Sequence, residues 1–540
     1  MKENQALHSG SGSAEPVSSD TTPLLTELGQ RLGPDKIETD AGRLAYFSGD
    51  FSEILLERPA AVVRPGSLEE VVVIVKAARA HGVSVVPRGG GMSYSLGYAP
   101  ARPGAVLLDM RALDRIVDID TRNLTVTVEP GVTWKQLHEA LLPTGYRIGF
   151  MGTMSGVAAT IGGGLGNNAT GHGRGDITDD LLGVEVVLAD GSVLNTGGRA
   201  TSPGSPVNRG YGPDFTGLFV GDCAAFGIRT QATFRLQRRP VGVAYACYGF
   251  QDPYALADAL CDVERSGLAV SNMAFSDYHH RVFAGQSPTA AERRAMIRDL
   301  RAASATPVRF ARNMLTLARG MKFLAAWPHS VTSIVEGYDQ REAQRRAQHL
   351  GRLMRHHGGK RLNPSLGVVL TAQPFVPIDK LIVGIDGECS FPSNFTVPLD
   401  RARDALKLTD DFFARNEADM ERYGITWTRL LLTLKGMFGM EPIIYWRDRM
   451  NPLRYDVLSS EHRSQWGERP ADDEARACAI DLRKRLVAEL ECLQPVHFQI
   501  GKFYDYQGAL ASESERMMLA GFKDLVDCNR VMNPGALGLG

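Results

Sequence analysis

The chain has 540 residues, which is more than one ordinary hydrophobic core accommodates, so we expect about two or three domains. With 44% hydrophobic and 22% charged residues the composition is that of a globular protein, and a formal net charge of -1 gives no sign of a nucleic-acid or membrane partner. The seven cysteines are scattered without C-x-x-C or zinc-type spacing, so we expect no metal site and favour reduced thiols in a cytoplasmic protein.

The amino-terminal residues are mostly polar and small. We expect residues 1–22 to form a disordered arm, because they lack the apolar stretch of a signal peptide and are rich in Ser, Gly and Thr. Residues 24–32 then predict a short amphipathic helix. No later apolar run approaches the ~20 residues of a membrane span, so we expect none.

A β-α-β unit is predicted next. Residues 59–65 are typical of a strand, and Ser67 with the acidic residues behind it is typical of a helix N-cap. That helix should end at Gly82, which can adopt a positive φ. The β-branched run 83–86 is a second strand, and it leads directly into a glycine-rich loop.

The remaining elements of this first module are strands, turns and one helix. We predict a helix capped by Thr133 that ends near Gly145, and the module closes near Pro240. The predicted strands are 106–109, a hairpin of 116–120 and 124–128, a hairpin over 184–194 with an Asp-Gly turn, and 226–236.

Beyond residue 240 longer helical patterns appear. The predicted helices are 252–265, 288–303, 340–357, 400–420 and 472–491. Strands such as 331–338 lie between them. This pattern predicts a second α+β domain in which helices back an antiparallel sheet.

Two glycine clusters carry the chemistry. The first is Arg88-Gly89-Gly90-Gly91-Met92-Ser93, and the second, about seventy residues later, is Ala159-Thr160-Ile161-Gly162-Gly163-Gly164. Glycine lets backbone N–H groups approach an anion, so two such loops predict a diphosphate held from two sides. The first loop is neither a P-loop nor a G-x-G-x-x-G dinucleotide fingerprint, so a different nucleotide-binding fold is indicated.

The order of the motifs resembles the vanillyl-alcohol oxidase and p-cresol methylhydroxylase flavoprotein family, which also includes glycolate oxidase subunits, D-lactate dehydrogenases and alkyldihydroxyacetonephosphate synthase. The matching segments, in order, are Arg64-Pro65-Gly66-Ser67, the Arg88–Ser93 loop, Glu129-Pro130-Gly131-Val132, Ala159–Gly163, Asp180-Leu181-Leu182-Gly183, Phe226-Gly227-Ile228-Arg229-Thr230, His497-Phe498-Gln499-Ile500-Gly501-Lys502 and Met532-Asn533-Pro534-Gly535.

The resemblance implies an α+β protein with a two-subdomain FAD-binding domain and a cap domain that contains an antiparallel sheet. The implied ranges are 55–240 for the FAD-binding domain, 241–494 for the cap and 495–540 for a return to the first domain. The implied FAD-binding residues are Arg88, Gly89, Gly90, Gly91, Met92, Ser93, Thr160, Gly162, Gly163, Gly227, Ile228 and Asn533.

Some family members bind FAD covalently through a His that follows the glycines of the first loop. Met92 stands at that position, and a thioether cannot form this bond. Attachment from the cap stays open through His279, His280 or His329, although a surface or hydrogen-bonded histidine is the favoured interpretation of each. We therefore predict noncovalent FAD.

The C-terminal segment supplies the first candidates for catalysis. In the family this segment passes the flavin ring, so His497 and Tyr504 are candidates to orient or deprotonate a substrate hydroxyl, and Lys502 to face the flavin pyrimidine. Tyr445 and Arg447 of the cap are second candidates, for substrate binding, and for each of these groups a structural polar role is the competing interpretation.

Three activities remain open. The first is an FAD-dependent oxidoreductase that oxidises an aromatic (phenolic) alcohol or alkylphenol by hydride transfer to flavin N5, in the catabolism of aromatic compounds. The second is a 2-hydroxy-acid dehydrogenase, although no second histidine cluster pairs with His497 as the metal-dependent members would require. The third is a non-redox lyase or transferase. We expect the protein to form a homodimer and to bind a small-molecule substrate.

Overall fold

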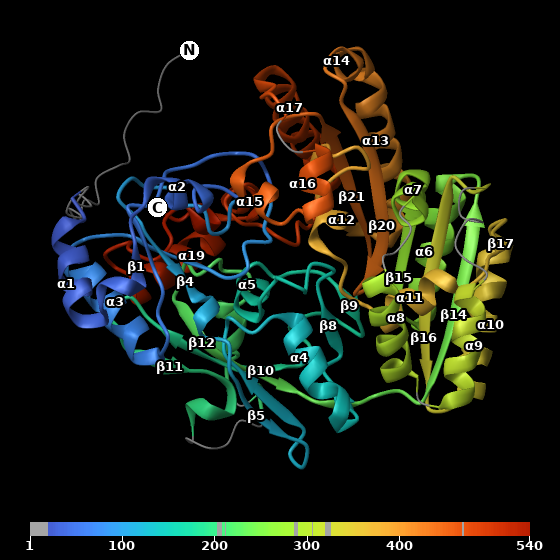
Figure 1. Ribbon diagram of the computed structural model, residues 1–540, viewed down its shortest axis with the longest axis horizontal. Helices are drawn as coiled ribbons and strands as arrows, with labels where there is room; N and C mark the ends of the chain where they lie inside the picture. Colours follow the sequence, from blue (N-terminus) through green and yellow to red (C-terminus); the bar gives the residue numbers. More distant parts are fainter. Residues whose placement is uncertain are drawn as a thin grey trace.

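The computed structural model describes residues 20–201, 208–210, 212–285, 290–304, 306–318, 326–466 and 469–540. Most of the predicted amino-terminal arm, residues 1–19, lies outside this range. Figure 1 shows two modules side by side: the first part of the chain and its C-terminal segment form one, and the elements between them form the other. No helix in the described part is both long enough and apolar enough to cross a bilayer.

The first module begins with a four-stranded sheet in the order β1-β2-β4-β3. Its strands are β1 (Ile37–Glu38), β2 (Ala61–Val63), β3 (Val85–Arg88) and β4 (Val106–Asp109). The last three are parallel, as the β-α-β unit requires. The crossover helix is α3 (Leu68–Ala80), and the Ser67 side chain accepts a hydrogen bond from the Glu70 N–H, which confirms the predicted cap.

A five-stranded antiparallel sheet forms the second half of this module, in the order β11-β10-β12-β6-β5. Its strands are β5 (Ile116–Asp120), β6 (Thr125–Val128), β10 (Leu181–Val187), β11 (Val193–Asn195) and β12 (Ile228–Arg235), so both predicted hairpins form. Thr133 and Gln136 make a reciprocal capping box at the start of α4 (Trp134–Leu141), which packs on this sheet through Trp134.

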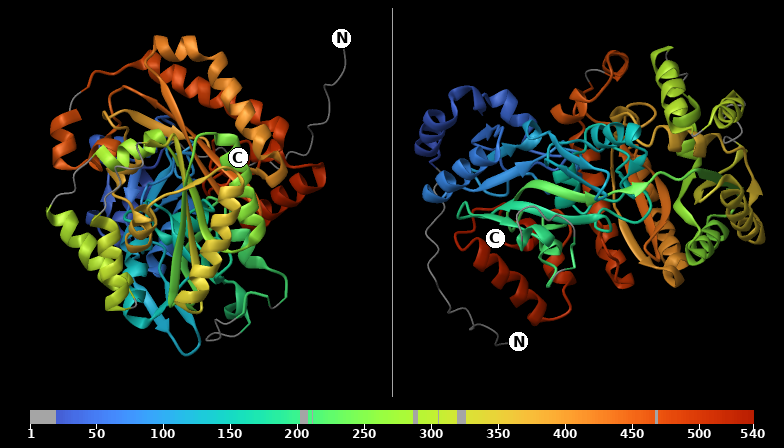
Figure 2. Two further views of the ribbon diagram at one scale, coloured as in Figure 1. Left: turned by 90° about the vertical axis from the view of Figure 1, so that its right-hand side faces the viewer. Right: turned by 90° about the horizontal axis from the view of Figure 1, so that it is seen from below.

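The C-terminal segment lies against the first module (Figure 1 and Figure 2). The Val85 N–H donates to the Val531 carbonyl at 2.8 Å, so the segment extends the edge of β3. On α19 (Glu513–Val526) the buried Lys523 ammonium donates to the Ala225 and Met532 carbonyls and pairs with Asp527. These contacts fix the C-terminal segment beside the β3 loop.

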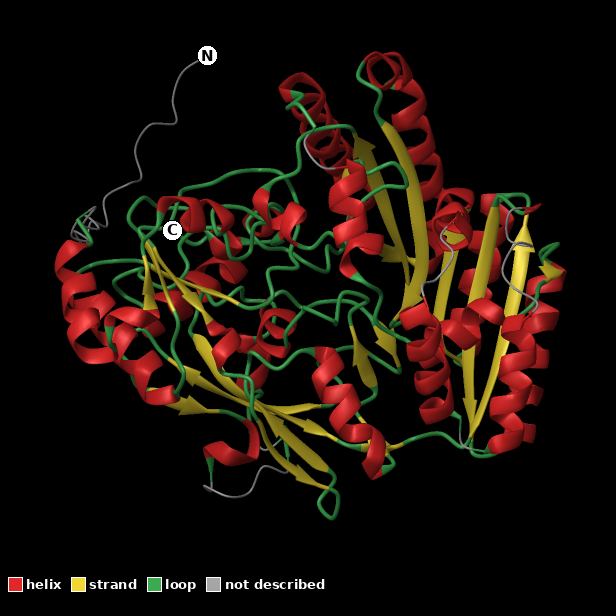
Figure 3. Ribbon diagram, in the orientation of Figure 1, coloured by secondary structure: helices red, strands yellow, loops and turns green. Residues whose placement is uncertain are grey.

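The second module is a large antiparallel sheet backed by helices, as predicted (Figure 3). Its strands run in the order β17-β14-β16-β15-β20-β21-β18, and β19 also pairs with β21. Their bounds are β14 (Gly242–Phe250), β15 (Ala269–Ser276), β16 (His329–Gly337), β17 (Lys360–Arg361), β18 (Cys389–Pro392), β19 (Phe395–Pro398), β20 (Thr426–Leu434) and β21 (Met437–Trp446). A continuous buried core joins one face of the sheet to its helices.

Five long helices belong to the second module. They are α6 (Pro253–Ser266), α8 (Ala290–Ala303), α10 (Gln340–His356), α13 (Ala402–Arg415) and α17 (Asp473–Leu490). One prediction needs correction: 400–420 is not a single helix. Asn416 ends α13, where its side-chain amide donates to the Phe412 carbonyl at 2.7 Å, and the short α14 (Glu417–Arg422) follows.

The other helices and strand pairs are shorter. They are α1 (Thr22–Leu32), α2 (Ala41–Tyr46), α5 (Ile161–Gly166), α7 (Asp277–Gly285), α9 (Pro307–Ala318), α11 (Ser365–Ala372), α12 (Ile378–Ile382), α15 (Pro452–Asp456), α16 (Ser460–Trp466), α18 (Tyr506–Ala509), and the strand pairs β7 (Tyr146–Arg147) with β13 (Gln237–Arg238) and β8 (Phe150–Gly152) with β9 (His172–Gly173).

Candidate cofactor and substrate site

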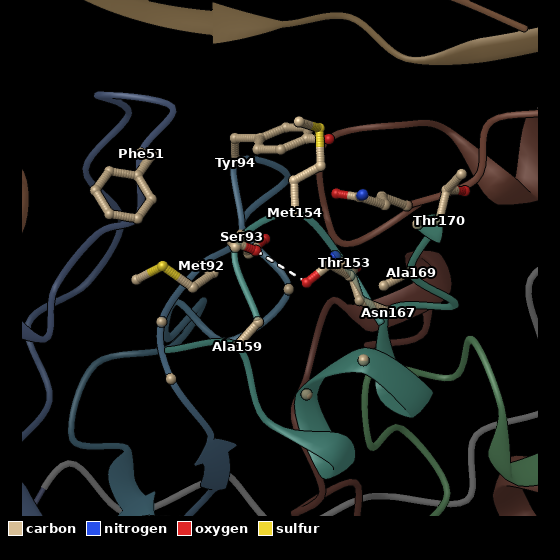
Figure 4. A pocket seen from close by; sticks show the side chains of 18 of the residues that line it. Phe51, Met92, Ser93, Tyr94, Thr153, Met154, Ala159, Asn167, Ala169 and Thr170 are labelled. Atoms are coloured by element: carbon tan, nitrogen blue, oxygen red, sulfur yellow. Dashed lines mark hydrogen bonds between the residues drawn. The ribbon is translucent and has the colours of Figure 1, made fainter. Parts of the chain in front are cut away.

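A cavity of about 290 Å³ lies between the two modules. The first module lines it with the loops that follow β3 and precede α5, and the second module lines it with one face of the strands β15, β20 and β21. Figure 4 shows the first-module side, where Phe51 and Met92 lie on one side of Ser93 and Asn167 and Thr170 lie on the other. The cavity is therefore a space between a glycine-rich floor and a sheet roof.

The two glycine loops are in direct contact. A Cβ on Gly90 would lie 1.8 Å from the Ala158 carbonyl oxygen, and one on Gly89 would lie 2.2 Å from Thr160 Oγ1. Gly162 packs equally closely on Pro130, where a Cβ would come within 2.5 Å of the proline ring. Only glycine fits at these three positions, so the backbone itself is the surface offered to a ligand.

Arg88 introduces a positive charge behind the first loop. Its side chain is 1% exposed, and none of its guanidinium nitrogens has a hydrogen-bond partner among the described residues. The guanidinium lies 4.7 to 5.1 Å from the ring centroids of Tyr46, Phe47 and Tyr98, and it packs against Gly91. A buried cation without an acceptor is costly, so this cavity favours an anionic group such as a diphosphate at the loop.

Most of the predicted FAD-binding residues line this cavity. They are Arg88, Gly89, Gly90, Gly91, Met92, Ser93, Thr160, Gly162, Gly163 and Ile228. Two do not: Gly227 packs on Val186, and the Asn533 side chain is directed into the protein. Asn533 donates to the Gly97 carbonyl at 2.8 Å and to the Cys223 carbonyl, so it supports the loops from behind. The glycine cradle and the unpaired guanidinium fit the diphosphate of FAD.

The roof of the cavity is an apolar face with one carboxyl group. On β21 the alternating residues Glu441, Ile443 and Tyr445 line the cavity, as the two-residue period of a strand requires. Neighbouring strands add apolar side chains, and Tyr278 packs on Tyr445 with ring centroids 4.5 Å apart. The roof residues from β15 and β20 are Met273, Phe275, Leu430 and Leu432.

Glu441 makes no hydrogen bond or ion pair with another described residue. Removal of its carboxyl group from water raises the pKa of Glu441 to about 7. The positively charged lining residues in the described chain, Arg88 and Arg229, both belong to the first module, and Arg229 is paired with Asp222. The second module thus contributes a carboxyl group to the cavity and, among its described lining residues, no lysine or arginine.

Of the five residues predicted to act in catalysis, only Tyr445 lines the cavity. Tyr504 and His497 lie behind the wall, stacked with ring centroids 4.0 Å apart. The Tyr504 hydroxyl accepts from the Asn394 N–H at 3.0 Å, and His497 Nδ1 donates to the Asn394 carbonyl at 2.8 Å. Both rings are thus held by the backbone of Asn394, which suits a supporting role.

Lys502 and Arg447 also lie outside the lining of the cavity. Burial lowers the pKa of Lys502 to about 7, and its ammonium donates to the Ala99 carbonyl and to Asn533 Oδ1. Arg447 has a side chain that is 69% exposed and faces Asp386 at 3.6 Å on the outer surface. Alternation alone would place residue 447 on the same face as Tyr445, but β21 ends at Trp446 and the chain leaves the sheet before Arg447.

Sequence reasoning missed Glu441, Tyr94 and His279, which all line the cavity. Glu441 did leave a signal, since it is the one acidic residue within the otherwise apolar strand β21. Tyr94 directly follows the glycine loop. His279 was considered only for cofactor attachment.

The glycine contact gives a direct test of cofactor binding. We expect Gly90→Ala to lose most of its bound FAD, because the added methyl group must displace the Ala158 carbonyl and separate the two loops. The ratio of flavin to protein absorbance in the purified protein measures this. Gly521→Ala is the matched control, since no atom lies within 4 Å of its Cβ. Full flavin occupancy in Gly90→Ala would contradict the assignment.

Comparisons with known proteins indicate that the chain binds FAD. Residues 59–197 match the family model described as an FAD binding domain. A probable mitochondrial D-lactate dehydrogenase of Danio rerio is 33% identical over 223 residues, which are 41% of this chain and 43% of that protein. Glycolate oxidase subunit GlcD of Bacillus subtilis (strain 168) is 31% identical over 262 residues, 48% of this chain and 54% of that protein.

The chain thus spans about half the length of the curated relatives it matches. The solved structure of p-cresol methylhydroxylase with substrate bound superposes with a TM-score of 0.71 at 18% identity and covers 96% of each chain, which shows the fold. The chain is therefore an FAD-binding flavoprotein related to FAD-dependent oxidoreductases, with its FAD binding domain at residues 59–197 and FAD as its cofactor.

Proposed function

We propose that the protein is an FAD-dependent oxidoreductase of the vanillyl-alcohol oxidase type that oxidises an uncharged aromatic alcohol or alkylphenol. The observation that carries this proposal is the isolated carboxyl group of Glu441 in an apolar and aromatic roof that has no lysine or arginine among its described residues. FAD supplies the hydride acceptor when it is bound. The chain's own residues must bind the substrate, orient it and remove its proton.

Substrate binding falls to the aromatic side chains of the cavity. Phe275, Tyr278 and Tyr445 form the roof, and Phe51 and Tyr94 enclose the cavity from the first module. Such walls pack on an aromatic ring and keep water out. The exclusion of water is also what raises the pKa of Glu441, so the binding surface and the acid-base group depend on the same packing.

Proton removal falls to Glu441. A carboxylate with a pKa near the working pH is well suited to accept a hydroxyl proton on Oε1 or Oε2 while the hydride leaves the substrate carbon. Burial also lowers the pKa of His279 to about 4, so this ring is neutral at pH 7. Its Nδ1 lies 3.0 Å from Ser276 Oγ, which fixes the ring beside the cavity.

A 2-hydroxy acid is the second candidate substrate. The names of the curated relatives favour it over an aromatic alcohol, because they include a D-lactate dehydrogenase and a glycolate oxidase subunit. A substrate carboxylate would need a charged or multiply donating partner. The described roof residues offer no such cation, and no group of three metal-ligating side chains occurs in the described part of the chain.

The substrate class is tested by anaerobic bleaching of the flavin absorbance. We expect 4-hydroxybenzyl alcohol and an alkylphenol to bleach the holoprotein, and D-lactate and glycolate to leave it oxidised, because a carboxylate finds no cation in the roof. Bleaching by the hydroxy acids alone would transfer the assignment to the second candidate. Substrate conversion without bleaching would indicate a non-redox lyase or transferase.

Noncovalent FAD remains part of the proposal. Of the three histidines considered for attachment, His280 has both ring nitrogens hydrogen-bonded, and His329 is not among the lining residues. His279 lines the cavity, but its Nδ1 is already engaged with Ser276. After acid precipitation we expect the flavin in the supernatant. Flavin that stays in the pellet of the parent protein, and moves to the supernatant in His279→Glu, His279→Gln or His279→Ala, would contradict this.

The role of Glu441 is tested by Glu441→Gln, which keeps the shape of the side chain and removes its charge. We expect flavin reduction to slow by about 10²–10⁴-fold, the usual effect of losing a general base. In the unaltered protein the reduction rate should rise with pH through about 7 as Glu441 ionises, and this rise should disappear in the variant. Stopped-flow absorbance measures both effects.

Stability supplies a second readout. The folded-state pKa of Glu441 lies above its ordinary value of 4.5, so the cost of its charge develops between these two values as the pH rises. Glu441→Gln should therefore be more stable than the parent above pH ~7, by up to about 3 kcal/mol, and no more stable below pH ~4.5. Glu417→Gln, an exposed carboxyl on α14, is the control and should change neither reading. An unchanged reduction rate in Glu441→Gln would exclude this residue as the base.

A cytoplasmic homodimer that acts in the catabolism of aromatic compounds also remains a proposal. The names of two relatives, from Danio rerio and Arabidopsis thaliana, include the word mitochondrial.

A further inference from the structure

The helices α8 and α9 form an outer layer on the second module, next to α11 (Figure 1). Their inner faces are apolar and pack on α11 around the buried Leu300 and Val368. The other side chains in this contact are Met296, Ala303, Phe310, Met314, Leu317 and Ala372. These residues account for the fold of the two helices and leave their outer faces to be explained.

The outer faces carry large aliphatic side chains that are exposed. Val308 is 79% exposed, Leu315 is 61% exposed and Ile297 is 45% exposed. Val308, Arg312 and Leu315 follow the spacing of one helix face, opposite Phe310 and Met314. Single exposed apolar residues are common, but Val308 and Leu315 share one face of α9, and α9 contacts α8, which carries Ile297.

The same outer faces are strongly basic. Residues 290–318 contain six arginines and two acidic residues, in a chain whose formal net charge is -1, and five of the six arginines are exposed, whereas Arg309 is buried. Arg294, Arg301 and Arg312 are exposed and have no ion pair with a described residue, whereas Arg298 pairs with Asp299 at 2.8 Å. The near-zero charge of the whole chain therefore conceals a local excess of positive charge.

We propose that the outer face of α8 and α9 docks the protein on an anionic phospholipid surface. Arginines attract the headgroups, and the aliphatic side chains between them enter the boundary between headgroups and acyl chains, which is the composition of helices that lie in a membrane interface. An acidic protein would also satisfy the charges. The exposed Ile297 on α8 and Val308 and Leu315 on α9 favour the lipid surface, because aliphatic side chains need an apolar layer beneath the charged one.

Docking at this face would place the bilayer near the cavity wall. Gln373, directly after α11, donates to Asp299 of α8 at 2.8 Å. Three residues later Val376 lines the cavity. The chain from the proposed docking face to the substrate cavity is therefore short and continuous.

The experiment is sedimentation of the holoprotein with vesicles. We expect binding to vesicles of equal parts phosphatidylglycerol and phosphatidylcholine at about 0.1 M salt and loss of binding at about 1 M salt, where the screening length falls from ~10 to ~3 Å. Vesicles of phosphatidylcholine alone should not bind. The variant Arg294→Gln/Arg301→Gln/Arg312→Gln should lower the partition coefficient by about 100-fold, from ~5-fold for each arginine.

Two further variants make the test specific. Val308→Ser/Leu315→Ser should weaken vesicle binding while all charges remain. Arg341→Gln/Arg345→Gln/Arg352→Gln, on the exposed face of α10, removes the same charge from a helix without exposed large aliphatic residues and should keep vesicle binding. All these positions are exposed, and flavin content checks that each variant folds.

Three outcomes would overturn the proposal. The first is the absence of binding to the anionic vesicles. The second is an equal loss of binding in the α8–α9 and α10 arginine variants. The third is salt-sensitive retention of the protein on a polyglutamate resin without any vesicle binding. The last result would assign the face to an acidic protein partner.

Discussion

The close contact between two backbone segments is the constraint on which the structure depends. Gly90 lies against the Ala158 carbonyl and Gly89 against Thr160, although the two loops are some seventy residues apart in the chain. Side chains at these positions would separate the loops. Because Gly89 and Gly90 have no side chains, the loops form one continuous wall of backbone groups, with the Arg88 guanidinium buried directly behind it. A diphosphate is the kind of ligand that offers acceptors to such a wall.

The rest of the first module keeps this contact in register. The parallel strands β2, β4 and β3 bring the first loop to the sheet edge, and the hydrogen bonds of Val85 with the C-terminal segment hold that edge in place. Lys502 and Asn533 bridge the Ala99, Gly97 and Cys223 carbonyls beneath the loops. Lys502, which we predicted to face the flavin, and Asn533 thus support the cofactor site from behind.

The second module contributes an ionisable group to the cavity through the packing of its sheet. Its sheet buries one face under helices, and the other face packs on α11 at β14 and β16 and lines the cavity at β15, β20 and β21, so alternate residues of β21 face opposite environments. Glu441 falls on the cavity face and has no partner there, and desolvation alone raises its pKa to about 7. Any change that admits water to the cavity would return this carboxyl group toward its ordinary pKa.

Local patterns predicted the elements well, because caps, turns and β-branched runs act within a few residues. Ser67, Thr133 and both hairpins of the first module behave as the sequence indicated, and the glycine loops line the cavity. Long-range packing was beyond such patterns. His497 and Tyr504 lie behind the wall because Asn394 binds both, and Glu441 faces the cavity because of the sheet's orientation, neither of which is encoded in neighbouring residues.

The most direct measurement is the position of FAD in a crystal structure of the holoprotein. The account predicts the diphosphate within about 3 Å of the backbone N–H groups of the Gly89–Ser93 loop, and the flavin ring under the roof formed by Phe275, Glu441 and Tyr445. A diphosphate that contacts neither glycine loop, or a flavin ring outside the cavity, would contradict it.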